Sequence, residues 1–364
     1  MQSSLRYCVG LDVSKDILQV CLSVIDLAGR VSVKATTKVD NKPTGFTQLL
    51  GWVGRHRKLN LPMTYVMEST GVYHEAVAWH LYQLDALVSI LLPNKARHYL
   101  QSLGYKSKND KIDAQGLSRM GLEQQLAPWK PLSKNIYALR LLTRQHQRLQ
   151  ELKTQSTNQQ HALAHSAFDS SFIDRQLAST ITFYDQQLVE LERAIKALIE
   201  ADMELKPRVE RLVAIKGMGL LSVAVLIAET NGFEGFHNQR QLVSYAGYDV
   251  VENQSGHHRG RTRISKKGNS RLRRILHLPA FTAVRFGEPT CQALFERVYA
   301  SSKVKMKAYV AVQKRLLLMV YALWRKGCAY EADYVANLAE AAKKIVPTSR
   351  TTQDQEAEAI LSYV

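Results

Sequence analysis

The sequence predicts an α/β N-terminal domain, a central α-helical coiled coil and a mostly α C-terminal domain. Three observations support this division. Strand-like and helix-like patterns alternate as far as Pro128, a repeat of apolar residues typical of long helices follows Ile136, and apolar helical runs occupy the chain after Pro207. We therefore expect domains at residues 1–130, 131–206 and 207–330, followed by a polar C-terminal tail at 331–364.

The first domain begins with three runs that are rich in β-branched residues and separated by turn signals, as expected of consecutive antiparallel strands. Helical periodicity then alternates with two further strand-like runs. The predicted strands are Tyr7–Val13, Ile17–Val24, Val31–Val39, Met63–Glu68 and Leu87–Leu92, and the predicted helices are Pro43–His56, Tyr73–Leu84 and two that start at Asn94 and Asp110. Three strands followed by helix–strand–helix–strand–helix is the order of a ribonuclease-H-like domain. In that fold, strand ends at one edge of the sheet gather the metal-binding acids.

The central region carries apolar residues at alternating spacings of four and three. These residues are Leu177, Ile181, Tyr184, Leu188, Leu191, Ile195 and Leu198, and they form the seam of a predicted coiled coil. The preceding stretch 139–163 is either its antiparallel partner or a surface that pairs with another subunit. A hairpin that only spaces two domains explains the pattern as well as a dimerisation element does.

A glycine turn opens the third domain. Lys216-Gly217-Met218-Gly219 leads into the apolar run Leu220–Ala228, a pattern typical of a helix-hairpin-helix element. Amides at the start of the second helix can hold a DNA phosphate without reading the base sequence. Lys216, Gly217 and Gly219 are therefore candidate nucleic-acid contacts, although a simple tight turn between two helices explains the glycines equally well.

Four acidic residues lie in patterns that suit metal binding. Asp12 lies near the end of the first strand-like run, Glu68 ends the fourth, and Asp110 and Asp113 open a helix with both carboxylates on one face. Carboxylates gathered at one place repel one another unless divalent cations hold them together. Their oxygen atoms suit Mg²⁺, with Mn²⁺ as a substitute, and two such ions can support phosphodiester chemistry. Each acid also has a structural explanation when it is taken alone, since Asp110, for example, suits a helix cap.

The stretch from Ser255 to Ile275 is strongly basic and contains no acid. Apolar runs flank it, which favours a folded, phosphate-facing surface over a disordered tail. Ser255 has the surroundings of a nucleophilic hydroxyl that attacks a phosphodiester, because guanidinium groups stabilise the charge developing on the phosphate. The alternative is that Ser255 is a turn serine and the cations only bind nucleic acid. The candidate contacts are Arg259, Arg261, Arg263, Lys266, Lys267, Arg271, Arg273 and Arg274.

The charge of the chain also indicates a polyanionic partner. Its 364 residues carry 49 Lys and Arg against 32 Asp and Glu, a net charge of +17, and each phosphate that such a protein neutralises releases counterions. Basic ribosomal and membrane-surface proteins share this composition, so charge alone names no function. The four cysteines lie in apolar runs without CxxC spacing and predict reduced core thiols. With no signal-peptide pattern and no apolar run long enough to span a bilayer, we expect a cytoplasmic protein without membrane partners.

Taken together, these motifs resemble the transposases of the insertion sequence 110 family, including its 1111 branch, and the related Piv-type DNA invertases. The resemblance covers most of the chain, and although each motif is common, all of them in this order are specific. The motifs are Gly10-Leu11-Asp12, Glu68-Ser69-Thr70-Gly71-Val72-Tyr73, Asp110-Lys111-Ile112-Asp113-Ala114, Ile215-Lys216-Gly217-Met218-Gly219, Tyr245-Ala246-Gly247, Ser265-Lys266-Lys267-Gly268 and Leu272-Arg273-Arg274. Tyr248-Asp249-Val250 stands where many relatives carry Leu-x-Pro, so Ser265 and Ser270 stay alternative candidates for the nucleophile.

The resemblance implies a bacterial DNA transposase or recombinase with a RuvC-like N-terminal domain and a C-terminal transposase domain. It implies that Asp12, Glu68, Asp110 and Asp113 are a DEDD set of Mg²⁺ ligands and that Ser255 joins covalently to DNA. The implied partners are the element ends and target DNA, a non-coding guide RNA that pairs with both, and further copies of the chain in a dimer or tetramer. In such an assembly the acids of one subunit act with the serine of another. The protein would associate with the nucleoid when bound to DNA.

Three other functions fit part of the sequence. A RuvC- or resolvase-like Mg²⁺-dependent nuclease would hydrolyse DNA with the four acids alone and form no serine adduct. A sugar or acetate kinase of the actin-like fold also opens with a Gly-x-Asp strand, but it needs a second glycine-rich phosphate loop that the sequence lacks. A non-catalytic nucleic-acid-binding protein would need only the positive charge.

Overall fold

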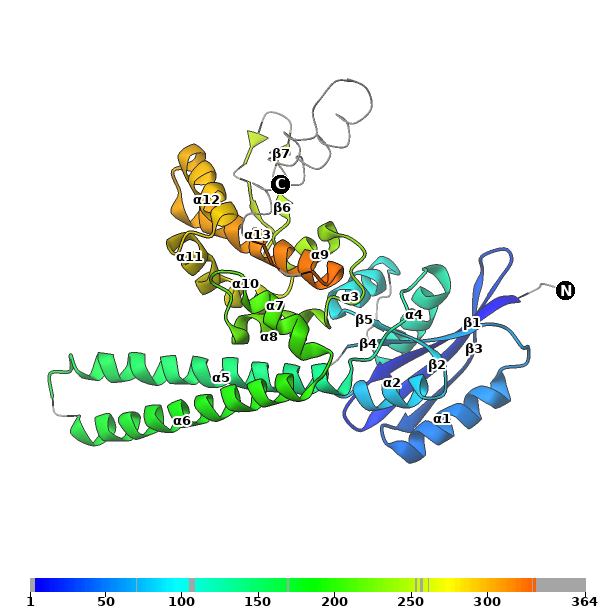
Figure 1. Cartoon of the computed structure of the whole chain (residues 1–364). Coiled ribbons are helices and arrows are strands. Elements are labelled where there is room, and N and C mark those ends of the chain that lie inside the picture. The colour runs from blue at the N-terminus through cyan, green and yellow to red at the C-terminus, as the bar shows by residue number, and fades with distance from the viewer. Residues whose placement is uncertain are drawn as a thin grey trace, which may run out of the picture. The chain divides into compact units, whose positions relative to one another are not determined.

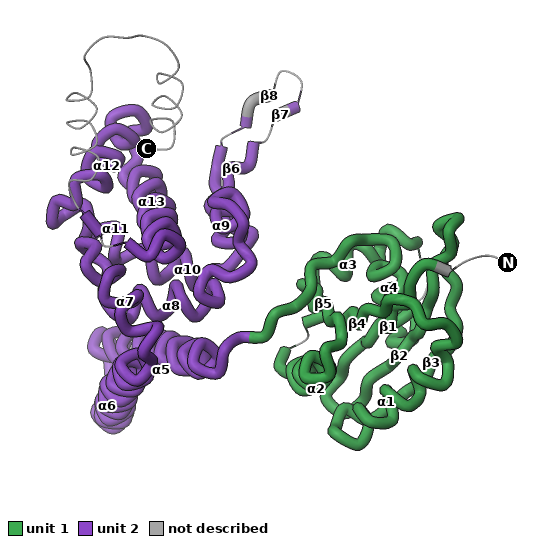
Figure 2. The backbone as a smooth tube through the Cα atoms, turned by 45° about the vertical axis from the view of Figure 1, so that its right-hand side comes forward, with its two compact units in different colours: residues 1–131 green, residues 132–364 purple. Residues whose placement is uncertain are grey.

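The chain forms two compact units, residues 1–131 and residues 132–364 (Figure 2). The computed structural model describes residues 4–69, 71–104, 109–168, 170–252, 254–255, 258–260, 262–328 and 330–331. The predicted tail therefore lies outside the described residues apart from its first position. Among the helices that the structure describes, none is both long enough and apolar enough to cross a membrane.

Unit 1 is built on a five-stranded sheet with the order β3-β2-β1-β4-β5 (Figure 1). The first three strands are antiparallel, and β4 and β5 run parallel to β1. The strands are β1 Ser4–Val13, β2 Ile17–Asp26, β3 Val31–Asp40, β4 Met63–Glu68 and β5 Leu87–Leu91. The element order predicted for a ribonuclease-H-like domain is confirmed.

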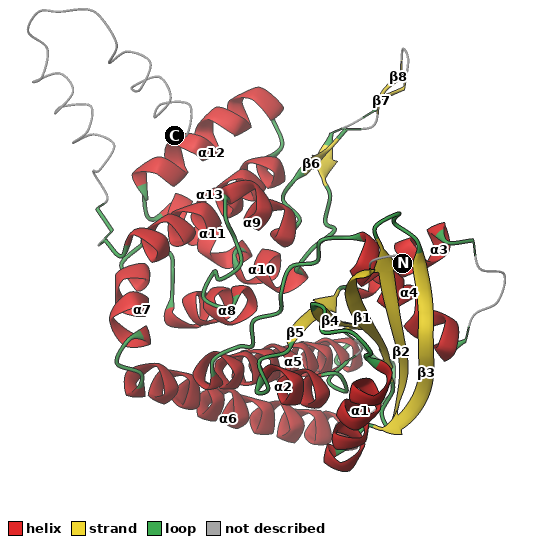
Figure 3. Ribbon diagram, turned by 90° about the vertical axis from the view of Figure 1, so that its right-hand side faces the viewer, coloured by secondary structure: helices red, strands yellow, loops and turns green. Residues whose placement is uncertain are grey.

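Helices cover both faces of this sheet (Figure 3). Alternate residues of β1 belong to two different cores, because successive side chains of a strand point to opposite faces. Tyr7, Val9 and Leu11 pack with α1 Pro43–His56 and α2 Glu75–Tyr82. Cys8 packs instead with α3 Pro93–Ser102 and α4 Asp110–Glu123. Asp12 shares the parity of Cys8, so it belongs to the face that α3 and α4 cover.

Unit 2 begins with a long helical hairpin of α5 Lys134–Leu163 and α6 Ser171–Ala201. The two helices are antiparallel, because polar pairs between them join early residues of one to late residues of the other. These pairs are Asn135–Asp202 at 2.7 Å, His146–Glu192 at 3.1 Å, Lys153–Asp185 at 2.5 Å and Gln160–Asp174 at 3.0 Å. The predicted seam residues are the less exposed positions of α6. Stretch 139–163 is thus an intrachain partner, whereas a supercoil and a role in dimerisation stay predictions.

The remaining helices of unit 2 share one core with the base of the hairpin. Ile195 and Ile199 of α6 and Leu139 of α5 are buried in the same cluster as the apolar helix α8. The helices are α7 Leu205–Val213, α8 Leu220–Thr230, α9 Gln239–Ala246, α10 Ser270–Ile275, α11 His277–Arg285, α12 Pro289–Ser302 and α13 Lys305–Lys326. The hairpin is therefore anchored in the C-terminal helices and is not a free spacer at its base.

Short strands that the sequence did not lead us to expect lie just before and within the start of the basic segment, which is the stretch from Ser255 to Ile275. β6 Val250–Val251 pairs with β9 Arg263–Ile264, and β7 Gln254–Ser255 pairs with β8 His258–Arg259, both antiparallel. The two pairs follow one another along a narrow ribbon that extends away from the helices of unit 2 (Figure 3). Each strand has only two residues, which is too short for an alternating pattern to stand out in the sequence.

Candidate active site

Asp12 and Glu68 lie at the ends of two neighbouring strands. Leu11 of β1 pairs in parallel register with Met67 of β4, so the next residue of each strand is one of the two acids. Paired strands lie about 4.8 Å apart. Val66 and Glu68 have the same parity in β4, and Val66 packs with α4, so both acids belong to the α4-covered face. Both side chains are partly buried.

Helix α4 crosses β1 in very close contact because two glycines face the crossing. A Cβ atom at Gly10 would lie 2.1 Å from the carbonyl oxygen of Ala114 and 2.4 Å from the amide nitrogen of Ser118. A Cβ atom at Gly121 would lie 2.4 Å from Cys8 Sγ. Gly10 therefore lies against residues 114–118 of α4, whereas Cys8, which is earlier in β1, lies against Gly121, which is later in α4. The helix thus runs antiparallel to the strand.

This register brings the first turn of α4 to Asp12. Two strand residues cover roughly 6.6 Å, which corresponds to about four to five helix residues at about 1.5 Å each. Gly10 lies opposite residues 114–118, so Asp12, two residues further on, lies opposite the turn that carries Asp110 and Asp113. Asn109 caps this helix by accepting a hydrogen bond from the Ile112 amide at 2.9 Å. Asp110 is therefore the first helical residue and not the cap.

The backbone thus brings the four acids to one end of the sheet, but their side chains do not form a closed cage. Within the described part of the chain, no three or more His, Cys, Asp or Glu side chains form a group that could hold a metal ion. Two carboxylates about 5 Å apart repel by about 3 kcal/mol at an effective dielectric constant of about 20. Such repulsion favours side-chain orientations that keep the charges apart. A divalent cation would reverse this preference, and the set of carboxylate oxygens is the kind that Mg²⁺ takes.

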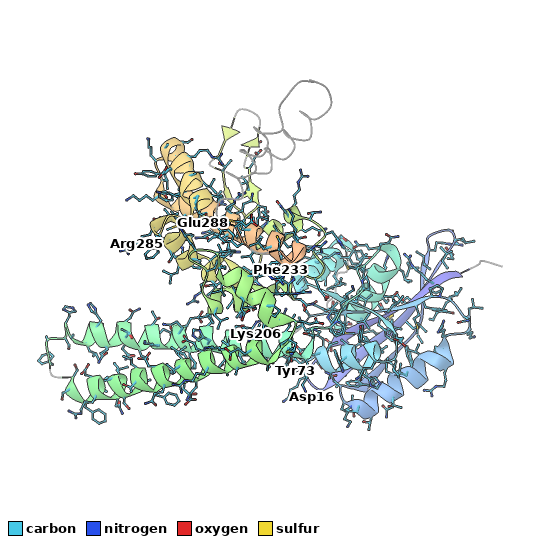
Figure 4. All side chains as sticks on the ribbon, in the orientation of Figure 1. Asp16, Tyr73, Lys206, Phe233, Arg285 and Glu288 are labelled. Carbon is cyan, nitrogen blue, oxygen red and sulfur yellow. The ribbon has the colours of Figure 1, made fainter. Side chains whose placement is uncertain are left out.

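Asn41 and Ser69 tie the loops around these acids together. Asn41 Nδ2 donates to the carbonyl oxygens of Ser14, at 2.9 Å, and Tyr73, at 3.0 Å. The backbone N–H of Asn41 donates to the Asp16 carbonyl. Figure 4 labels Asp16 and Tyr73, which lie close together at this end of unit 1. Ser69 donates from both its amide and its hydroxyl to the Leu91 carbonyl of β5. Ser14, Ser69 and Tyr73, which follow the two acids in the chain, are therefore held in place by protein contacts.

In unit 2, Ser255 is exposed on the ribbon, paired with His258. Because Ser255 is exposed, its hydroxyl is accessible to a nucleic acid. Arg259 lies in the partner strand β8. The Arg259 side chain and the whole of Arg261 lie outside the described residues, so their expected contacts with nucleic acid stay predictions.

The two alternative serines have other surroundings. Ser265 is held at the base of the ribbon, where its hydroxyl donates to Asp249 Oδ1 at 2.6 Å and its amide donates to the Asp249 carbonyl at 2.8 Å. The Ser265 hydroxyl also accepts from the Lys267 amide at 3.2 Å. These bonds give Ser265 a structural role. Ser270 is the exposed first residue of α10, whose cap is Asn269.

Acidic residues of other helices lie beside arginines of the basic segment. Glu229 of α8 is buried and accepts two hydrogen bonds from Arg144 of α5, at 2.7 and 3.1 Å, and one from Asn269 at 2.7 Å. Arg271 Nε lies 3.9 Å from the same carboxylate. Burial acts to raise the pKa of Glu229, but the bonds from Arg144 and Asn269 and the charges of Arg144 and Arg271 outweigh it, so the pKa is lowered.

The cations of this segment thus divide into two groups. Arg271, Arg273 and Arg274 contact protein groups: Arg273 donates to the Ala246 carbonyl at 2.7 Å, and Arg274 pairs with Glu151 of α5. Arg263, Lys266 and Lys267 are exposed. This exposed group is the better candidate for phosphate contacts. Gly268 follows it in a tight fit, since a Cβ atom there would lie 2.4 Å from the Tyr245 carbonyl oxygen.

The glycine turn connects α7 and α8, and a helix-hairpin-helix element at this position stays a prediction. Lys216 and Gly219 are exposed, and Gly219 is the residue that caps α8. Gly217 has a φ of +93°, and a Cβ atom there would lie 2.8 Å from the Ala283 amide. Gly217 is thus required for packing against α11, and a phosphate-binding role for this turn stays a prediction.

Several residues of the site escaped the sequence analysis. Asn41 lies in the polar turn Asp40-Asn41-Lys42 and Asp249 lies between Tyr248 and Val250, and nothing in either local pattern indicates the distant partners. Glu229 offered a usable signal, because it is a lone acid that ends the apolar run Leu220–Ala228 and so is drawn towards the core.

Comparisons with known proteins agree on one family. Residues 209–296 match the family described as "Transposase IS116/IS110/IS902 family", and residues 9–169 match a model of IS110-type DEDD transposases described as "Transposase". The "Pilin gene-inverting protein" of Moraxella bovis is 28% identical over 326 residues, which cover 89% of this chain and 97% of that protein. The "Insertion element IS110 uncharacterized 43.6 kDa protein" of Streptomyces coelicolor is 28% identical over 46% of this chain and 40% of its own.

Among solved structures, the RuvC protein of Thermus thermophilus aligns over 34% of this chain and 99% of its own, with 13% identity and a TM-score of 0.27. The strand order of unit 1, and not this alignment, is the basis of the fold assignment. The two family models match the acid-bearing N-terminal region and the C-terminal region in the order that the motifs predict. The chain belongs to the IS110 family of transposases.

Proposed function

We propose that this transposase cuts and rejoins DNA through a covalent phosphoserine link on Ser255, with Mg²⁺ held by Asp12, Glu68, Asp110 and Asp113. The observation that carries the proposal is the convergence of the ends of β1 and β4 with the first turn of α4. These three elements come from distant parts of the sequence, and each presents an acid on the same face of the sheet. A purely structural explanation would have to account for acidic residues on all three of these neighbouring backbone elements.

The bound Mg²⁺ would polarise the scissile phosphate and favour the charged form of the attacking oxygen. In the proposed step, the Ser255 oxygen bonds to the scissile phosphorus while the bond from phosphorus to one deoxyribose oxygen breaks. The serine proton passes to solvent, and the leaving deoxyribose oxygen takes up a proton. The phosphoserine ester that remains conserves the energy of the phosphodiester, so a DNA hydroxyl can attack it and reseal the strand.

The partners in this proposal are element-end and target DNA, a guide RNA and further copies of the chain. The exposed cations Arg263, Lys266 and Lys267 supply positive charge for a phosphate backbone, which DNA and RNA share. The family resemblance is the support for an RNA guide and for a dimer or tetramer. The contacts described for unit 2 fit either nucleic acid.

The test is an adduct assay on the full chain. Protein, element-end DNA with the flanking RNA, and Mg²⁺ are incubated, denatured and separated on a gel that resolves protein–DNA conjugates. We expect a Mg²⁺-dependent conjugate from the native chain, and none from Ser255→Ala or Asp12→Asn. Ser265→Ala is the matched control at the base of the same ribbon, and it should retain the conjugate. Free nicked DNA from the native chain and from Ser255→Ala alike would instead indicate a hydrolytic nuclease.

A mixing experiment tests whether the acids and the serine act across subunits. Neither Asp12→Asn nor Ser255→Ala should form a conjugate alone. If one active site takes its acids and its serine from two chains, the mixture should regain conjugate on the Asp12→Asn chain, which still carries Ser255. A mixture that stays inactive would mean that both parts come from one chain.

A further inference from the structure

Gln19 is a buried polar side chain beside Asp12 that no motif singled out. Gln19 pairs directly with Asp12 across the antiparallel strands β1 and β2. Residues paired in this way point to the same face, with Cβ atoms about 4.5–5.5 Å apart. The neighbours of Gln19 confirm the face: Leu18 and Val20 belong to the core under α1 and α2, so Gln19 points the other way, towards α4.

The amide of Gln19 is only half satisfied. Gln19 is 5% exposed, and its Nε2 donates to the carbonyl oxygen of Thr37 in β3 at 3.0 Å. Its Oε1 is buried and has no hydrogen-bond partner among the described residues. The bond to Thr37 fixes which end of the amide is the oxygen, because a carbonyl accepts only from the NH₂ group. Leaving a buried acceptor unpaired costs about 1–3 kcal/mol of folding free energy. A bound group that donates a hydrogen bond to Gln19 Oε1 would remove this cost.

The acids around Gln19 cannot supply that donor. Ionised carboxylates only accept hydrogen bonds, and Asp12 is the neighbour of Gln19 in β1. Lys38, its neighbour in β3, is exposed and forms no hydrogen bond to Gln19 Oε1. A water molecule on a divalent cation has the required chemistry, because it is a strong donor and Mg²⁺ usually keeps several of its waters. Groups that hold such outer ligands typically change metal affinity 10- to 100-fold when they are removed.

We propose that Gln19 Oε1 accepts a hydrogen bond from a water on the cation bound by Asp12, and that Gln19 is a positioning residue of the metal site. The inference rests on the proposed function, since it requires a divalent cation at the four acids. It adds a neutral acceptor to the set, which fixes the orientation of the hydrated cation without adding charge.

The experiment measures Mn²⁺ binding to the full chain by electron paramagnetic resonance of the free ion. Gln19→Leu, which removes the acceptor at similar volume, should raise the dissociation constant for Mn²⁺ about 10- to 100-fold. The matched control is Ser23→Ala. Ser23 is a buried polar residue on the same face of β2, and its hydroxyl bonds to Ser118 of α4 at 2.8 Å, four residues away from Gln19. Ser23→Ala should leave the Mn²⁺ dissociation constant within about twofold.

Gln19→Glu guards against a merely misfolded variant. It keeps an acceptor oxygen and adds a negative charge, so the melting temperature without metal should fall while the rise caused by Mn²⁺ should exceed that of the native chain. Lost folding cannot produce that gain. Native-like Mn²⁺ affinity of Gln19→Leu, together with lost binding in Asp12→Asn, would overturn the role of Gln19 alone. Native-like affinity in Asp12→Asn would overturn the metal site itself, and the inference with it.

Discussion

The contact between Gly10 and α4 offers a sharp test of how the acids are brought together. In Gly10→Ala the added Cβ would meet the Ala114 carbonyl oxygen at 2.1 Å, whereas ordinary contact begins at 3.4 Å. The helix must therefore move by about 1.3 Å, because both sides of this contact are backbone and neither can rotate away. Overpacking of this kind costs about 1–3 kcal/mol. A displacement of about 1 Å at a catalytic group can lower the rate by about 100-fold.

The stability assay is urea unfolding followed by tryptophan fluorescence. Trp52, Trp79 and Trp129 lie in unit 1 and only Trp324 lies in unit 2, so the signal reports mainly on the unit that carries the change. The functional readouts are the Mn²⁺ dissociation constant and the rate of conjugate formation. We expect Gly10→Ala to lose stability, to bind Mn²⁺ more weakly and to form the conjugate much more slowly.

The matched control is Gly54→Ala in α1, on the other face of the sheet. A Cβ atom at Gly54 meets nothing within 4 Å, and alanine favours a helix interior over glycine by about 0.5–1 kcal/mol. Gly54→Ala should therefore gain slightly in stability and keep native metal binding. Native Mn²⁺ affinity and native stability in Gly10→Ala would refute the reasoning, because α4 would then not depend on the missing side chain for its place.

Further predictions concern both units. Glu229→Gln should destabilise the chain by about 1–3 kcal/mol at neutral pH. The pKa of Glu229 in the folded state is lowered from its ordinary 4.5, so the ionised carboxylate stabilises the fold above pH 4.5 and this stabilisation is lost as the pH falls through the folded-state pKa. The difference in unfolding free energy between the native chain and Glu229→Gln, measured in urea, should therefore shrink in acid, and a difference that does not change with pH would count against this role of Glu229. Lys267→Ala should weaken nucleic-acid binding and reduce by about one the slope of log binding constant against log salt concentration. Arg273→Ala, which loses the bond to the Ala246 carbonyl, should mainly lower the melting temperature. The reverse pattern in binding titrations and thermal melts would contradict the division of the cations into two groups. Native protein should show one fast-reacting thiol of four in a thiol-reagent assay, because Cys328 is exposed while burial raises the pKa of Cys8, Cys21 and Cys291; a second fast thiol would disagree with the core as described.

The fold of unit 1 could be predicted because its signals are local. The first strands are β-branched runs ended by turns, and all five predicted strands overlap the observed ones. The helix predicted at Tyr73–Leu84 begins two residues later and ends two residues earlier, at Glu75 and Tyr82, since helix ends depend on capping contacts more than on periodicity.

Features that depend on distant partners could not be predicted. The basic segment contains no acid, and the sequence alone led us to expect that only phosphates could balance it. In the structure, Glu229 of α8 lies beside Arg271 of this segment, and Glu151 of α5 pairs with its Arg274. Cys328 was predicted to be a core thiol and is exposed, because the apolar run before it ends with α13 at Lys326. Gln19 left a trace in the sequence, as a polar residue within a buried strand, but its significance depends on the register with Asp12.

The central claim is that the ends of β1 and β4 and the start of α4 hold a divalent cation, and anomalous diffraction from a crystal soaked in Mn²⁺ tests it most directly. We expect anomalous density within coordination distance of Asp12 and Glu68, with Asp110 or Asp113 completing the set and a water between the ion and Gln19 Oε1. Saturating Mn²⁺ that leaves these four carboxylates without anomalous density, or that occupies only sites elsewhere on the chain, would contradict the account.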